Sequence, residues 1–202
     1  MLLQQNAIQF SALYQDVNDS QPGTSFVSPT GGQIWAGIVG QTWQINDANA
    51  LIRSDTTIST LYGGIYQYVQ FLSTSTAANA KGQIVFYSSV ANRAGFIVTP
   101  DPTTALSQVA GVTLGAVTKG NYGIIQIAGL ANVLCKATVT DTTAGDVGFV
   151  VSDSSIGKVD ANTPASATAA QQAAKIGIFL DAPANAGFKR MWIQPAILTN
   201  CY

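Results

Sequence analysis

The 202-residue sequence contains no histidine and no glutamate, so all ten of its acidic residues are aspartate. Histidine is the commonest general base and metal ligand because its pKa lies near neutrality. Without it the chain cannot form a Ser-His-Asp or Cys-His nucleophile, and it lacks the usual ligands of a catalytic zinc ion. These absences disfavour an enzyme, and we expect no catalytic residue, no cofactor and no metal site.

Charge is scarce as well: 9% of the residues are charged, against about a quarter in an average soluble domain. No apolar run approaches the roughly 18 residues of a bilayer-spanning helix. The nine basic residues are scattered and form no cluster for phosphate groups, so we expect neither nucleic acid nor a membrane as partner. So little charge protects weakly against association, which favours a surface buried in an assembly. A secreted domain of low charge is the alternative.

Two cysteines, Cys135 and Cys201, are too few for a disulfide framework. The first residues have neither the basic region nor the apolar region of a signal peptide. Both observations favour assembly in a reducing cytoplasm.

Short β-favouring runs recur along most of the chain, each bounded by Gly, Asn, Asp or Pro. Residues 132–139 alternate with a period of two, as in a strand with one buried face. This density of strands without long helices predicts an all-β fold, either a β-sandwich or a small β-barrel with an extended N-terminal arm. The predicted strands are residues 33–39, 65–72, 82–87, 95–99, 122–128, 132–139, 147–151, 176–180 and 188–194. Residues 47–53 are predicted to form a short helix, and residues 165–175 a helix or a loop.

We divide the chain at Gly63-Gly64, into an N-terminal arm of residues 1–63 that is partly extended and a β-rich domain of residues 64–202. Aromatic residues on an arm without its own core must be buried elsewhere, either on the β-rich domain or on a neighbouring subunit. Our hypothesis is that the arm reaches a neighbouring subunit. The tyrosines beside the boundary favour an interface too, with stacking on sugars as the alternative. We assign Met191 and Trp192 to the core. The candidate interface residues are Phe10, Tyr14, Phe26, Trp35, Trp43, Tyr62, Tyr66 and Tyr68.

Two motifs have a chemical and a structural interpretation. Ser155-Ile156-Gly157-Lys158 matches the S-x-x-K nucleophile pattern, but Gly157 interrupts the helix that this chemistry needs, so a hairpin turn is favoured. Four aspartates are close in sequence but too widely spaced for a calcium loop. Because each lies beside Gly, Ser, Thr or Asn, we interpret them as turn residues. They are Asp141, Asp146, Asp153 and Asp160.

From Gly111 onward the order of short motifs resembles that of the phage capsid decoration, or cement, proteins. The motifs are Gly111-Val112-Thr113-Leu114, Lys119-Gly120-Asn121-Tyr122-Gly123 leading into residues 124–129, Thr143-Ala144-Gly145-Asp146-Val147, and residues 174–181. Ala144-Gly145-Asp146 is also a turn in which Gly145 can adopt a positive φ. About sixty N-terminal residues depart from the family pattern.

The resemblance implies a virion protein on the outer capsid surface, assembled in the bacterial host cytoplasm. Its partners would be the major capsid protein and copies of itself, with a homotrimer expected. The alternative function is a glycan-binding or fibre-anchoring module of the phage head or tail.

Overall fold

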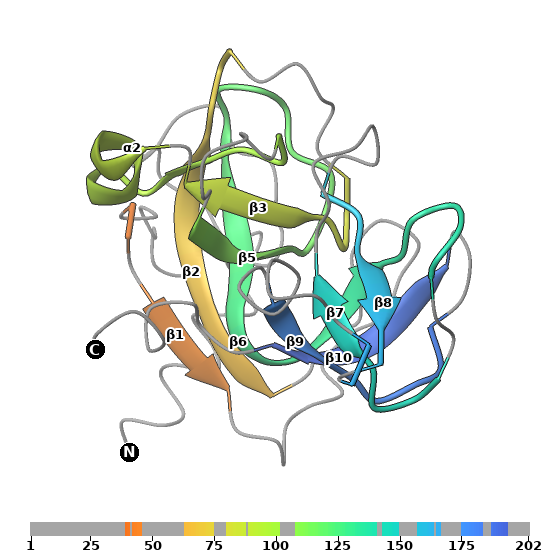
Figure 1. Ribbon diagram of the computed structural model, residues 1–202. Coiled ribbons are helices and arrows are strands. Elements are labelled where there is room, and N and C mark those ends of the chain that lie inside the picture. Colours follow the sequence, from red (N-terminus) through yellow and green to blue (C-terminus); the bar gives the residue numbers. More distant parts are fainter. Residues whose placement is uncertain are drawn as a thin grey trace, which may run out of the picture.

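The structure is a computed structural model that describes residues 39–40, 42–45, 63–74, 80–87, 89–101, 108–140, 143–149, 157–163, 165–166, 175–183 and 187–193. Within these ranges the protein is almost entirely β, as predicted, with ten strands in one sheet and one five-residue helix. The sheet curls into a half-barrel (Figure 1).

The strands and the helix follow one another in this order: β1 (Thr42–Ile45), β2 (Gly64–Phe71), β3 (Ile84–Tyr87), α2 (Val90–Ala94), β4 (Ile97–Val98), β5 (Gln108–Thr113), β6 (Tyr122–Leu134), β7 (Val147–Phe149), β8 (Asp160–Asn162), β9 (Lys175–Phe179) and β10 (Phe188–Ile193).

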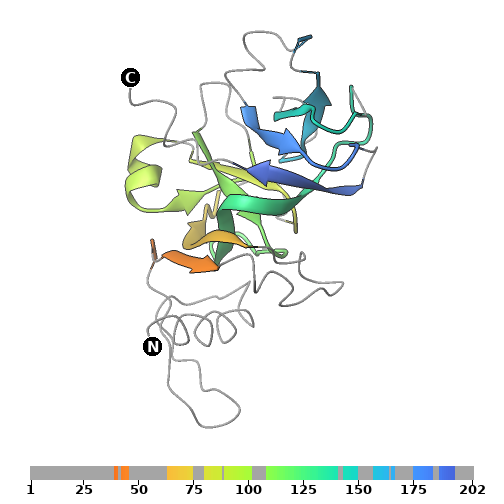
Figure 2. The same ribbon diagram turned by 90° about the horizontal axis from the view of Figure 1, so that it is seen from below.

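The sheet has the strand order β1-β2-β6-β10-β9-β7-β8, so β1 and the β7–β9 group lie at opposite ends (Figure 2). All neighbours along this path are antiparallel. β3 pairs with β5, β5 pairs with β6, and the two-residue β4 runs parallel to β2. β1 comes from the predicted arm, so this part of the arm joins the sheet of the β-rich domain.

β6 is the thirteen-residue strand around which the sheet is organised. It pairs with β2 from Tyr122 to Gly129 and with β10 from Gly129 to Leu134. Gly129, where the two ladders meet, has a φ of +101°, a backbone conformation that only glycine adopts without strain. A Cβ atom there would overlap the carbonyl oxygen of Gly63. This glycine therefore allows one strand to serve both parts of the curled sheet.

Among the described residues, two core clusters lie on the two faces of β3, all four residues of which are buried. Ile84 and Phe86 pack with β6, β9 and β10 residues, whereas Val85 and Tyr87 pack with β2 and early β6 residues. Because side chains alternate along a strand, a continuous apolar run is expected where both faces are covered.

Observed strands overlap the predicted ones at residues 65–72, 82–87, 95–99, 122–128, 147–151, 176–180 and 188–194. The prediction for residues 132–139 was only partly right, because β6 runs on from residue 122 and ends at Leu134, and Ala137 is exposed. β1, β5, β8 and α2 were not predicted. The predicted helix at 47–53 and strand residues 33–38 lie outside the described residues, as do most of residues 165–175.

Two glycine substitutions can distinguish the stability cost of backbone strain from that of steric overlap. Gly129 and Gly145 both have positive φ, but a Cβ at Gly145 would meet no atom within 4 Å. We expect Gly145→Ala to lower the free energy of unfolding by about 1–2 kcal/mol, the cost of a left-handed conformation. Gly129→Ala should lose at least about twice as much, because backbone atoms of β2 must also move. Urea denaturation of both variants measures this, and equal losses would contradict the assigned role of Gly129.

Candidate interaction surface

Four large apolar side chains are exposed on one face of β9 and β10 and on the residue after β9. Their exposed fractions are 38% for Ile178, 48% for Leu180, 43% for Phe188 and 45% for Trp192. We call these four residues the apolar strip. They account for all the exposed large hydrophobic side chains in the part of the chain that the structure describes.

Strand alternation and register bring the strip together. Phe188, Arg190 and Trp192 point outward from β10, whereas Met191 and Ile193 are buried in the core. Trp192 lies directly opposite Ile178 of β9, and side chains that face each other across antiparallel strands are in contact range. On its other side Trp192 lies opposite Leu130 of β6, and Phe188 lies opposite Leu134.

Two features fix β9 against its neighbours. The register of β7 and β9 shifts beside Gly148, so Phe149 pairs with Lys175 and the buried Ile176 is the extra residue. At Gly177 a Cβ atom would overlap the carbonyl oxygen of Trp192. The close approach of the two backbones therefore requires a glycine at that position, and it holds Ile178 beside Trp192.

Charged groups lie within the strip and beside it. The Arg190 guanidinium donates two hydrogen bonds to Asp181, from Nε to Oδ2 at 2.8 Å and from Nη2 to Oδ1 at 2.6 Å. These bonds lower the pKa of the Asp181 carboxyl, and the nearby Lys189 adds to the effect. The Lys81 ammonium lies 5.1 Å from the centre of the Phe188 ring, a cation–π distance.

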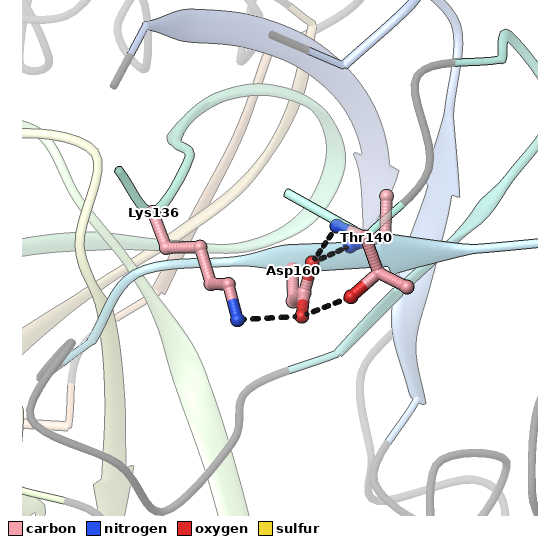
Figure 3. Close-up of polar contacts among 4 residues, drawn as sticks. Lys136, Thr140 and Asp160 are labelled. Atoms are coloured by element: carbon pink, nitrogen blue, oxygen red, sulfur yellow. Dashed lines mark hydrogen bonds and ion pairs between the residues drawn. The ribbon is translucent and has the colours of Figure 1, made fainter. Parts of the chain in front are cut away.

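A second set of polar contacts, the Asp160 cluster, joins the loop after β6 to β8 through Lys136, Thr140 and the buried Asp160 (Figure 3). Asp160 forms an ion pair of 2.9 Å with Lys136. It also accepts hydrogen bonds from the backbone and hydroxyl of Thr140 and from the Ala161 backbone. Burial of Asp160 by itself would raise its pKa, but these bonds outweigh burial, and the pKa is lowered. Asp160 is therefore held as a carboxylate that ties the loop to β8.

This arrangement corrects one prediction. Asp146 does lie in a turn, with its carboxylate accepting from the Thr143 backbone and Gly145 in positive φ as predicted. Asp160, in contrast, is a buried strand residue. Asp141 and Asp153 lie outside the described residues, as does Ser155 of the S-x-x-K match. Within the described ranges, no group of three metal-ligating side chains occurs.

The candidate interface residues whose side chains the structure describes do not form an aromatic cluster on the surface. Tyr66 and Tyr68 are 0% and 2% exposed, and the Tyr68 ring stacks on Tyr122 with 6.1 Å between the ring centroids. The prediction that these two tyrosines are exposed was wrong. Trp43 is described only by its backbone, which pairs with Tyr66. The remaining candidates, Phe10, Tyr14, Phe26, Trp35 and Tyr62, lie outside the described residues.

The sequence prediction also misplaced Trp192, which was assigned to the core together with Met191. Met191 is fully buried, but Trp192 is exposed. Adjacent residues of a strand point to opposite faces, so the two could not both face one core. Alternation along residues 188–193 was the signal that could have identified the strip.

No family model matches the chain, and no curated protein matches it. Among the helices of the described ranges, none has the length and apolar character needed to cross a bilayer.

The Asp160 cluster predicts a specific dependence of stability on pH. Because folding lowers the Asp160 pKa, the carboxylate stabilises the fold above its unfolded-state pKa of about 4. That contribution is lost as the pH falls through the lower pKa of the folded state. Asp160→Asn should cost about 3 kcal/mol of unfolding free energy at pH 7, the cost of breaking a buried pair. It should also make stability less sensitive to acid below about pH 4.

Asp181→Asn is the matched control, because the pKa of Asp181 is also lowered but its ion pair is exposed to solvent. We expect it to cost less than about 1 kcal/mol. Denaturant titrations of both variants between pH 7 and pH 3 test the difference. Equal losses of unfolding free energy in the two variants would show that the Asp160 cluster stabilises the fold no more than a surface ion pair does.

Proposed function

We propose that this protein is a non-enzymatic structural protein of a bacteriophage particle, which binds the outer surface of the assembled capsid as a small oligomer. The observation that carries the proposal is the apolar strip on a chain with so little charge. Clustered exposed apolar side chains on a soluble fold mark surfaces that bind partners, and a strip centred on a tryptophan has the composition of an interface core.

Three further features support this role. The absence of histidine and glutamate disfavours catalysis. The motif order from Gly111 onward resembles the capsid decoration proteins, and an all-β half-barrel is a rigid support for a binding surface. The proposed partners are the major capsid protein and other copies of this chain, with a trimer as the expected oligomer and the virion as the location.

The proposed mechanism is thermodynamic linkage. A protein that binds the assembled shell but not its free subunits shifts the equilibrium towards the shell. Each occupied site contributes about 2.7 kcal/mol when the free protein is at one hundred times its dissociation constant. Repeated over many sites, this modest contribution makes the shell resistant to disassembly without any covalent step.

The glycan-binding alternative loses two of the residues on which it depended. Tyr66 and Tyr68 are buried and cannot form a platform for sugars. Trp192 is accessible, but its register partner Ile178 offers no hydrogen-bonding group for sugar hydroxyls.

The test begins with the copy number in purified source particles, counted by quantitative mass spectrometry against the major capsid protein. We expect a simple ratio of about one, or about one third. Purified protein added to particles that lack it should bind to saturation at the same ratio and raise the temperature at which the shells disrupt. A handful of copies per particle would place the protein in the tail or a fibre, and its absence would reject the proposal.

A further inference from the structure

We propose that the apolar strip is the docking site for the N-terminal segment, residues 1–38, of a second copy of this chain. The inference rests on the self-association that the proposed function includes, and it names the surface and the segment that would form the contact.

The strip has the properties of the receiving half of an interface. Trp192 and Ile178 form a cross-strand pair, and Leu180 and Phe188 extend the surface from this pair in one direction along the two strands. Arg190 lies on the same strand face between Phe188 and Trp192, and Asp181 holds it in place through two hydrogen bonds. Side chains already fixed in position lose little entropy when a partner binds.

The charge around the strip argues against two strips packing face to face. Lys81 lies over Phe188 and Arg190 lies within the strip, whereas Asp181, which is paired with Arg190, is the acidic group beside them. A symmetric pairing of two copies would place these cations against one another, and like charges across an interface are costly. The partner surface should therefore be apolar and neutral or acidic.

Residues 1–38 have that composition. They contain Asp16 and Asp19 but no lysine or arginine, since the first basic residue of the chain is Arg53. Their net charge is therefore −2. They also contain four aromatic residues that need burial, namely Phe10, Tyr14, Phe26 and Trp35.

The length of the segment is compatible with contact between copies. It precedes β1, which β2 and β6 separate from β10, a distance of about 14 Å at ordinary strand spacing. An extended segment of this length reaches roughly 125 Å, far beyond its own sheet. The segment is therefore long enough to reach the exposed strip of another copy.

Photo-crosslinking of the full-length protein tests the contact directly. A photoreactive amino acid replaces Leu180, and the variant is expressed with natural nitrogen and mixed with ¹⁵N-labelled wild type. We expect crosslinked peptides from residues 1–38 that carry the other isotope, and few such crosslinks when the same group replaces the exposed Lys119. Crosslinks within one chain, between two strips, or to no part of residues 1–38 would each overturn the proposal.

Sedimentation equilibrium of full-length variants gives the second test. Trp192→Ala should weaken self-association by at least ~30-fold, the effect of losing a hot-spot residue of about 2 kcal/mol. Asp16→Asn together with Asp19→Asn should weaken it several-fold, while the control Asp55→Asn should not. Unchanged association in the folded Trp192→Ala variant would reject the strip as the site.

The two proposals fail separately. If the isotope-mixed crosslinks form but the protein does not bind capsids, the capsid function is wrong and the contact between copies stands. If the protein binds capsids but the isotope-mixed crosslinks do not form, the capsid function stands and the docking site is wrong.

Discussion

β6 pairs with β2 along one edge and with β5 and β10 along the other, and this double pairing depends on the conformation of Gly129. Where the ladder to β2 ends, the ladder to β10 begins, so the strand bends while its backbone stays hydrogen-bonded. The bend carries β10, and with it β9 and β7, away from the plane of β1 and β2. The apolar strip lies on this displaced part of the sheet, and its position in the molecule therefore follows from one glycine.

Period-two patterns and turn residues were sufficient to predict the all-β class and most strands. They missed β5 because Gly111 interrupts its apolar pattern, although the structure needs a glycine there: a Cβ would overlap the carbonyl oxygen of Gln126. They missed β8 because its sequence, Asp160–Asn162, is that of a turn. Asp160 can lie in a buried strand because it forms an ion pair with Lys136, 24 residues earlier, and no local pattern reveals a partner at that distance.

The candidate site was harder to predict than the fold, for a related reason. Aromatic residues indicate burial or binding, and the choice depends on which face of a strand the sheet covers. Tyr66 and Tyr68 have the sequence context of an exposed cluster, yet β2 is an inner strand and both are buried. Trp192 has the context of a core residue, yet Met191 beside it takes the core face. Side-chain alternation was readable from residues 188–193, but the identity of the covered face required the strand order.

A contact in which one copy provides the segment and the next provides the strip is head-to-tail. Such heterologous contacts close into rings when the rotation between copies divides a full turn, and otherwise they propagate as filaments. The like charges bordering the strip disfavour the symmetric dimer that would compete with a ring. In a closed ring of three copies, every strip would bind the N-terminal segment of a neighbouring copy. The rest of each half-barrel would remain available for a capsid. The low surface charge would be consistent with the proposed ring, because the exposed apolar groups of each chain would then be buried between copies.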